Sequence, residues 1–149
     1  MKKRISYSLL FISFIVLLYQ ATKYLARTYI NPLESIELLP VLNLVSVRNQ
    51  GAAFGMFRSL GNNFFIAISF AAILFILWVI VFEKEDYRVF SLLAAGAIGN
   101  LIDRLTLGYV VEFIDVTVSG HHWPAFNVAD SALTIGITFM LVIIFIKKN

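Results

Sequence analysis

The sequence predicts a mainly α-helical membrane protein, a four-helix transmembrane bundle with a small β-rich segment on its outer face. The first observation behind this fold class is composition: of the 149 residues, 60% are hydrophobic and 14% are charged, whereas about 25% of residues are charged in soluble domains. The second is that the apolar residues form four runs, each close to the roughly 20 residues that cross a bilayer as a helix. We therefore expect residues 1–149 to form one integral membrane domain.

The predicted helices span residues 5–25, 64–82, 89–107 and 124–146. The first is preceded by Lys2, Lys3 and Arg4, as in a signal peptide, but its apolar run is too long and no small-residue cleavage site follows. We expect it to be retained as a helix. The second run is almost entirely apolar. The third and fourth contain polar residues, so any chemistry is expected there.

Basic residues in the short flanking segments predict the orientation, because cytoplasmic segments carry an excess of Lys and Arg. In a four-span chain they all lie on one side: Lys2, Lys3, Arg4, Lys84, Arg88, Lys147 and Lys148. Both termini are therefore expected in the cytoplasm, and residues 26–63 and 108–123 on the outer side. Residues 36–47 are rich in Leu, Val and Ile between turn-forming residues, which predicts short strands in a small sheet on the outer leaflet.

Several classes of function are disfavoured. The chain has no cysteine, which excludes disulfides, thiol nucleophiles and thiolate metal sites. His121 and His122 are adjacent, so they lack the spacing of two metal ligands on one helix face, and we expect exposed loop residues, no metal and no cofactor. The net charge of +3 comes from residues at span ends rather than from a basic stripe, which argues against nucleic-acid binding.

The third run contains Asn100, Asp103 and Arg104. Ionisable groups inside a span are costly and face the bundle interior. Asp103 and Arg104 lie three and four positions after Asn100. The three side chains are therefore expected to share a helix face and to be able to pair with one another. The simplest interpretation of Asp103 and Arg104 is a structural ion pair, and a functional role is the alternative.

A second group of acids lies near the outer side. Asp130 lies near the start of the fourth run, where a carboxylate that only interacts with the N-terminal helix dipole is the alternative interpretation, and Glu112 and Asp115 lie in an apolar stretch before it. Two or three carboxylates are expected to converge there. Convergent carboxylates share a proton, so that one activates water while the other polarises a carbonyl. This is the chemistry of an aspartic peptidase.

The segment from Arg48 to Gly55 is the other dense cluster. Gly51 and Gly55 permit tight turns, and Asn49 offers both a donor and an acceptor. An ordinary turn before the second helix is the alternative interpretation.

Five blocks, in order, resemble the lipoprotein signal peptidases, also called signal peptidase II. They are Gln20–Lys23, Val47–Gly55, Gly99–Arg104, Gly108–Asp115 and Phe126–Ala132. The resemblance implies a membrane-embedded aspartic endopeptidase of the bacterial inner membrane, with its active site toward the outer face. Such enzymes remove signal peptides from diacylglyceryl-modified prolipoproteins by cutting before the lipidated Cys. It also implies contacts with membrane lipids and with globomycin-type inhibitors.

The resemblance also implies roles for individual residues. Asp130 and Glu112 take the two catalytic positions. The substrate-binding positions are Asn49, Gly51, Asn100, Arg104 and Asn127, and the supporting positions are Lys23, Asp103 and Asp115.

Two residues depart from the family pattern. Glu112 stands where the family usually has Asp, and its extra methylene moves the carboxyl by roughly an ångström, which can cost about a hundredfold in rate. Tyr19 stands where the family usually has another Asp. These departures motivate a second hypothesis, a catalytically weakened relative that binds lipidated peptides or a membrane partner. A small transporter or channel is a third, although its site would be expected near the midplane.

Overall fold

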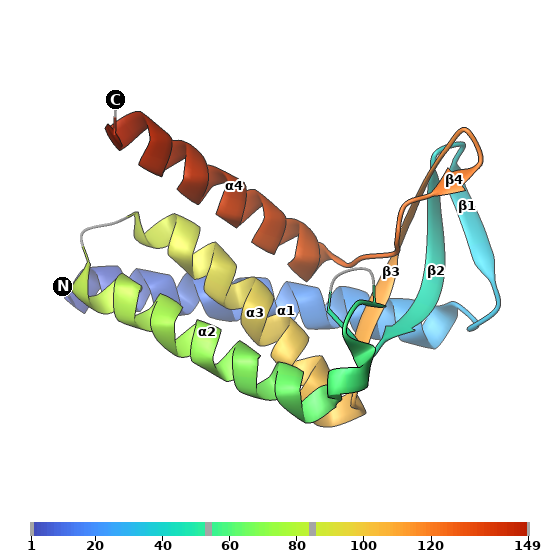
Figure 1. Ribbon diagram of the computed structural model, residues 1–149, viewed down its shortest axis with the longest axis horizontal. Helices are drawn as coiled ribbons and strands as arrows, with labels where there is room; N and C mark the ends of the chain where they lie inside the picture. Colours follow the sequence, from blue (N-terminus) through green and yellow to red (C-terminus); the bar gives the residue numbers. More distant parts are fainter. Residues whose placement is uncertain (1, 53–54, 84–85, 149) are drawn as a thin grey trace.

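The computed structural model describes residues 2–52, 55–83 and 86–148 (Figure 1). Two parts of the sequence interpretation fall outside them: Lys84, used for the orientation, and Ala53 and Phe54 of the second block. The side chains of Lys147 and Lys148 are likewise outside the description.

Four helices form a bundle: α1 (Lys2–Tyr29), α2 (Asn62–Phe82), α3 (Tyr87–Leu107) and α4 (Val128–Lys148). Each is long and apolar enough to cross a membrane, so the predicted class of a multi-pass, mainly helical protein is confirmed. The helix α4 begins at Val128 rather than at Pro124, because the chain before it pairs with the sheet through Phe126. The beginning of α1 and the end of α4 lie at the end of the molecule opposite the sheet (Figure 1).

The central helix is α3, which packs against the other three helices, whereas α1 has few contacts with α2 or α4. In the most apolar 18-residue stretch of α3, half of the residues are buried, whereas the buried share is 17% to 22% in the corresponding stretches of the other three helices. Glycine allows the close approach of α4: a Cβ at Gly96 would lie 2.9 Å from the carbonyl oxygen of Ala129. Small residues at helix contacts are typical of packing in membranes.

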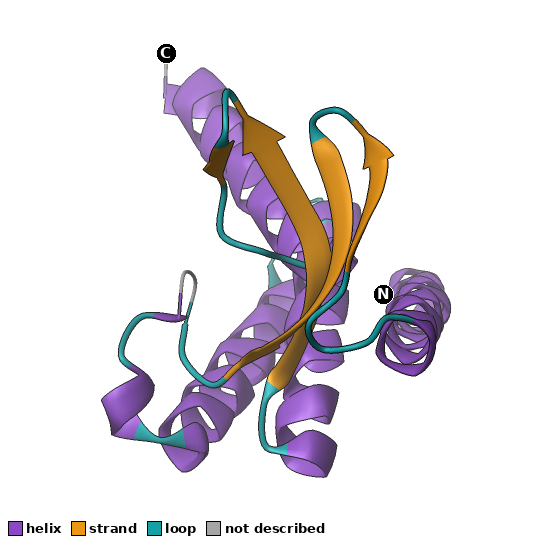
Figure 2. Cartoon of the chain, turned by 90° about the vertical axis from the view of Figure 1, so that its right-hand side faces the viewer, coloured by secondary structure: helices purple, strands orange, loops and turns teal. Residues whose placement is uncertain are grey.

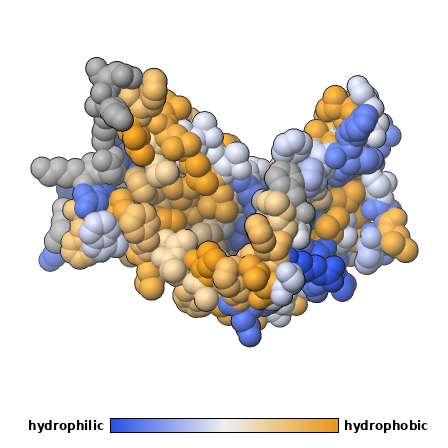
Figure 3. All heavy atoms as spheres, in the orientation of Figure 1, coloured by the Kyte–Doolittle hydropathy of each residue, from blue (hydrophilic) through white to orange (hydrophobic). Residues whose placement is uncertain are grey.

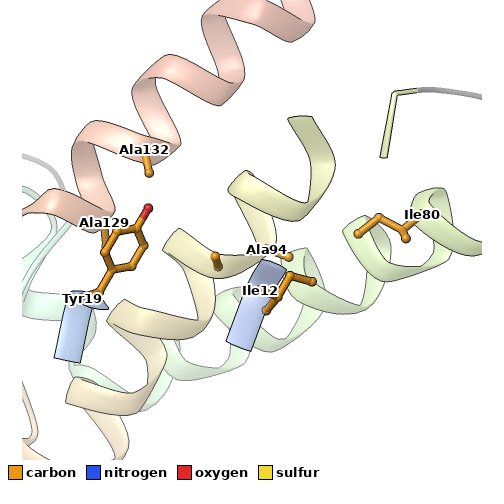
Figure 4. Close-up of a cluster of buried hydrophobic side chains, with 7 residues drawn as sticks. Ile12, Tyr19, Ile80, Ala94, Ala129 and Ala132 are labelled. Atoms are coloured by element: carbon orange, nitrogen blue, oxygen red, sulfur yellow. The ribbon is translucent and has the colours of Figure 1, made fainter. Parts of the chain in front are cut away.

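All four helices contribute to a cluster of buried hydrophobic side chains, with Ile80 as the member from α2 (Figure 4). The ring of Tyr19, which is 4% exposed, packs there beside Ala129 and Ala132. Outside this core, large apolar side chains cover the helices and give the bundle a hydrophobic surface (Figure 3). Such a surface suits contact with lipid.

An antiparallel sheet lies beyond the helices at one end of the bundle (Figure 2). Its strands, in spatial order, are β1 (Ser35–Leu39), β2 (Leu42–Asn49), β3 (Val110–Val118) and β4 (His121–His122). The strands predicted within residues 36–47 are present as β1 and β2. The strand β3 was not predicted. His121 and His122 are exposed as expected, but they form β4 rather than a loop.

A short 3-10 helix, η2 (Arg58–Leu60), precedes α2. The pairing of β2 with β3 places Val47 opposite Glu112 and Asn49 opposite Val110, after an irregularity between Leu44 and Val47. Irregularities of this kind re-aim the side chains of a strand. This pairing makes neighbours of two sequence blocks that are far apart along the chain, Val47–Gly55 and Gly108–Asp115.

Candidate active site

A cavity of about 780 Å³ lies where α3 and α4 meet the sheet, and the surface is hollowed between α4 and the sheet (Figure 3). Its polar lining includes five predicted site residues: Asn49, Asn100, Arg104, Glu112 and Asp130. Much of the rest is apolar and comes from the segment 123–126 and from α4. Polar groups converging in an apolar cavity are characteristic of a ligand or substrate site.

Glu112 lies on β3 and is 7% exposed. One of its carboxyl oxygens, Oε1, accepts a hydrogen bond from Asn49 Nδ2 at 2.5 Å. The orientation of the Asn49 amide is fixed, because its Oδ1 accepts from the Gly51 N–H at 2.7 Å and its Nδ2 also donates to the carbonyl of Ala52. The loop after β2 thus presents a donor to Glu112.

Burial raises the pKa of Glu112 to about 7, from an ordinary value of 4.5. The hydrogen bond from Asn49 opposes this rise, and the negative charge of Asp130 adds to it. Glu112 therefore exchanges a proton near neutral pH, as a general acid or base requires.

Asp130 lies in the first turn of α4 and forms a reciprocal cap with Asn127. The Asn127 N–H donates to Asp130 Oδ2 at 3.1 Å, and the Asp130 N–H donates to Asn127 Oδ1 at 3.0 Å. This is the capping-box arrangement, which satisfies two free N–H groups at a helix start. The second carboxyl oxygen of Asp130 accepts from Asn100 Nδ2 at 2.7 Å. Both acids are therefore held by an asparagine amide.

A buried lysine fixes the amide of Asn100. Lys23 Nζ donates to Asn100 Oδ1 at 2.7 Å and to the carbonyl of Gly99 at 3.3 Å, and it pairs with Asp103 Oδ2 at 2.9 Å. These contacts occupy all three ammonium donors. Because the Asn100 oxygen faces the ammonium group, its NH₂ group faces Asp130.

The expected pairing of Asp103 with Arg104 is wrong, because Asp103 forms its ion pair with Lys23, and both side chains are 2% exposed. Adjacent residues on a helix do not face each other, so a partner from α1 reaches Asp103 instead. Asp103 also accepts from the Val111 N–H at 2.9 Å, and Asn127 Nδ2 donates to the Val111 carbonyl at 3.1 Å. These two bonds hold the backbone immediately before Glu112.

Arg104 points toward the loop after β2. Its Nη2 donates to the carbonyl of Gly51 at 2.5 Å, and Nη1 lies 3.5 Å from Asn62 Oδ1. The guanidinium carbon lies 4.6 Å from the ring centroid of Phe65. Gly51 has no space for a side chain, since a Cβ there would lie 2.4 Å from the carbonyl oxygen of Met56. The requirement for glycine at position 51 is therefore steric.

Four predicted site residues are not among those that line the cavity: Lys23 and Asp103, described above, and Asn127 and Asp115. Asn127 is 0% exposed and acts on Asp130 and Val111 from behind the cavity. Asp115 is not among the described residues that line the cavity. It is three positions from Glu112, so the alternation of a strand points it to the other face, and there it contacts Asn43.

The electrostatic setting of Asp115 differs from that of Glu112. Burial tends to raise the pKa of Asp115, but hydrogen bonds from Asn43 and His122 outweigh it and leave the pKa lowered. Asp115 is therefore suited to a permanently charged contact rather than to proton exchange near neutral pH.

Sequence reasoning assigned no role in the site to three contributors, although Gln20 lies in the first of the five blocks. Gln20 donates to Asp103 Oδ1 at 3.2 Å and to the carbonyl of Gly99 at 2.9 Å. The segment 123–126 forms a wall of the cavity, which its position directly before Asn127 could have suggested. Asn62 donates to the carbonyl of Arg104, and no local pattern marks it. In residues 2–52, 55–83 and 86–148, no group of three or more His, Cys, Asp or Glu side chains is arranged to hold a metal ion.

The family model for signal peptidase (SPase) II matches residues 11–146. The chain is 48% identical over 135 residues to the lipoprotein signal peptidase of Thermodesulfovibrio yellowstonii, covering 91% of this chain and 88% of that protein. It is 40% identical to the lipoprotein signal peptidase of Staphylococcus haemolyticus, covering 100% and 98% of the two chains.

A solved structure described as a bacterial membrane enzyme, determined by the in meso method at 2.3 Å resolution, superposes with a TM-score of 0.86. It is 37% identical, and the match covers 97% of this chain and 91% of that chain. The similarity therefore extends over the helices and the sheet together.

Proposed function

The chain belongs to the signal peptidase II family, and from this premise we propose that it is an aspartic-type endopeptidase that removes signal peptides from bacterial prolipoproteins. Glu112 and Asp130 form the catalytic pair, with Glu112 in the place of the usual aspartate. The observation that carries this proposal is that both acids line one cavity and that each accepts a hydrogen bond from an oriented asparagine amide.

The two acids take different roles at the start of the reaction. Asp130 accepts from Asn100 and from the Asn127 N–H, and it lies at the positive end of a helix dipole, so negative charge is better compensated there than on Glu112. Asp130 is accordingly the base that removes a proton from water. Glu112, with a pKa raised to about 7 by burial, is the acid that donates its proton to the scissile carbonyl oxygen.

Hydrolysis then follows from these two positions. The activated water adds to the carbonyl carbon, and the tetrahedral intermediate carries the proton donated by Glu112. Collapse of the intermediate breaks the C–N bond as Asp130 returns its proton to the leaving amine. Glu112 recovers a proton from the hydroxyl group of the intermediate, which leaves the pair ready for another cycle.

The surroundings of the acids suit a lipid-modified substrate. The apolar wall of residues 123–126 and the α4 residues Leu133 and Ile135 would accept the signal peptide and the diacylglyceryl chains. The bond cut would be the one before the modified cysteine. Arg104 lines the same cavity and would bind substrate oxygens beside the loop that it holds.

We further propose that the protein resides in the bacterial inner membrane with both termini in the cytoplasm and the cavity toward the outer face. Lys2, Lys3 and Arg4 begin α1, and the end of α4 lies at the same end of the molecule (Figure 1). This is the basic end expected to remain on the cytoplasmic side.

Cleavage of a diacylglyceryl-modified prolipoprotein peptide by the purified protein tests the function. Asp130→Asn should abolish cleavage while the protein still folds, because the amide keeps the shape but cannot act as a base, and Glu112→Gln should do the same. Near-normal turnover in Asp130→Asn would remove Asp130 from the mechanism. Loss of cleavage in Asp115→Asn together with full activity in Glu112→Gln would assign the second role to Asp115.

The same assay addresses the alternative of a catalytically weakened relative. Binding of the lipidated peptide without any cleavage by the unmodified protein would establish that alternative and overturn the peptidase assignment.

A further inference from the structure

Four polar side chains meet on the face of the sheet that carries Asp115. Asp115 Oδ2 accepts from Asn43 Nδ2 at 2.9 Å and from Thr117 Oγ1 at 3.3 Å. His122 Nδ1 lies 2.9 Å from the same oxygen and 3.0 Å from Thr117 Oγ1. The cluster therefore joins β2, β3 and β4, and none of its members lines the cavity.

The burial of this histidine–carboxylate pair is uneven. The Asp115 side chain is 8% exposed and that of His122 is 65% exposed. A buried carboxylate with several fixed donors is a rigid acceptor, so His122 on the short strand β4 is held by Asp115 on the long strand β3. His121 differs, because its ring nitrogen contacts only the nearby carbonyl of Ser119 in the described contacts.

The chain that follows His122 is the cavity wall of residues 123–126. Its far end is fixed by Phe126, which exchanges backbone hydrogen bonds of 2.9 and 3.0 Å with Ile114. Its near end is fixed by the Trp123 N–H, which donates to the Val116 carbonyl at 2.7 Å, and by the side chain of His122. Trp123 itself lines the cavity.

We propose that Asp115 and His122 are positioning residues that anchor the cavity wall and thereby set how tightly the substrate is bound. The proposal rests on the proposed peptidase function, because it concerns the substrate of that same cavity. Neither residue touches the reacting atoms. Loosening the anchor should therefore raise KM and leave kcat nearly unchanged, since Glu112 and Asp130 are held by separate contacts.

Three variants of the β4 histidines test the anchor. His122→Asn keeps a donor in place, because its amide nitrogen and the histidine Nδ1 are both bonded to Cγ, whereas His122→Gln moves the donor one atom further out. His122→Gln should raise KM about tenfold, the effect of losing a hydrogen bond to a charged group, with kcat within about twofold of the original value. His122→Asn should restore most of the affinity. His121→Ala is the matched control and should change neither constant.

A second measurement does not depend on cleavage. Trp78 lies on α2, away from the cavity, and stacks on Phe75, so a Trp78→Phe background leaves Trp123 as the single tryptophan, since the chain has two. In that background, His122→Gln should increase acrylamide quenching of Trp123, whereas His122→Asn and His121→Ala should not.

The two measurements separate the possible failures. Unchanged KM and unchanged quenching in His122→Gln would overturn the anchor. An equal rise in KM in His122→Asn and His122→Gln would also overturn the anchor, because the effect on substrate affinity would then not depend on the position of the donor. If the unmodified protein cleaved no lipopeptide but quenching still rose in His122→Gln, the anchor would be supported and the peptidase function overturned.

Discussion

Replacing Glu112 by Gln should make the stability of the protein less dependent on pH. Glu112 is 7% exposed, and burial raises the pKa of its carboxyl to about 7 from 4.5. Between these values the folded protein binds a proton at Glu112 that the unfolded chain has released. Stability therefore falls as pH rises: the contribution is fully present below about 4.5 and is lost as pH passes through about 7.

The expected size follows from the shift. A difference of about 2.5 pKa units corresponds to about 3 kcal/mol at pH values above both pKa values. A neutral Gln cannot release a proton, and its oxygen can still accept the hydrogen bond from Asn49. The difference in unfolding free energy between Glu112→Gln and the unmodified protein should thus change by about 3 kcal/mol between pH 4 and pH 9, in favour of Gln at high pH.

Unfolding by SDS in mild detergent micelles, followed by circular dichroism from pH 4 to pH 9, measures this difference. Glu37→Gln is the matched control, because it makes the same change on an exposed position of the same sheet, where substitutions usually alter stability by less than about 0.5 kcal/mol. A difference for Glu112→Gln that stays constant across the pH range would refute the raised pKa. The proposed role of Glu112 as the acid would then lose its support.

Three further predictions concern the surrounding residues. Lys23→Met should destabilise the protein by about 3 kcal/mol or more, because it leaves Asp103 buried without its ion-pair partner; unfolding in the same assay measures this, and a loss below about 1 kcal/mol would contradict the role of the pair. Arg104→Lys should lower kcat/KM at least about tenfold, the equivalent of one hydrogen bond to a charged group, because lysine lacks the planar fork of donors; full activity would reduce Arg104 to an electrostatic role. Tyr19→Asp and Glu112→Asp should act non-additively on the cleavage rate if both departures set the spacing of the two acids, and additive effects would mean that the departures are independent.

The fold class could be predicted from the sequence because its signal is local. A run of apolar residues such as 64–82 identifies a membrane helix without reference to the rest of the chain. The start of α4 could not be located in this way, because the segment before it is apolar, yet its Phe126 pairs with Ile114 of β3 rather than continuing the helix. The strand β3 was hidden for a related reason: buried on both sides for most of its length, it lacks the alternation of a strand with one face in water.

The sequence indicated which residues belong to the candidate site better than it indicated which of them contact one another. Polar residues inside the apolar runs singled out Asn100, Asp103 and Asp130, of which Asp103 is buried and the other two line the cavity. Their partners were not visible, because Lys23 lies about 80 positions from Asp103, and only its neighbours along α3 could be inferred from helix spacing. A pair that depends on the packing of two helices requires the tertiary structure.

The contacts of Glu112 also bear on whether the site has adapted to a glutamate. The carboxyl meets the Asn49 amide at 2.5 Å, and the orientation of that amide is fixed by Gly51. Shortening the side chain by one methylene would withdraw the carboxyl by roughly an ångström, beyond the usual length of a hydrogen bond, unless β3 moved. The backbone before Glu112 is held from Asp103 and Asn127, so β3 is restrained from moving. The loop after β2 therefore fits the longer acid, and on this reasoning Glu112→Asp should lower turnover rather than restore a better enzyme.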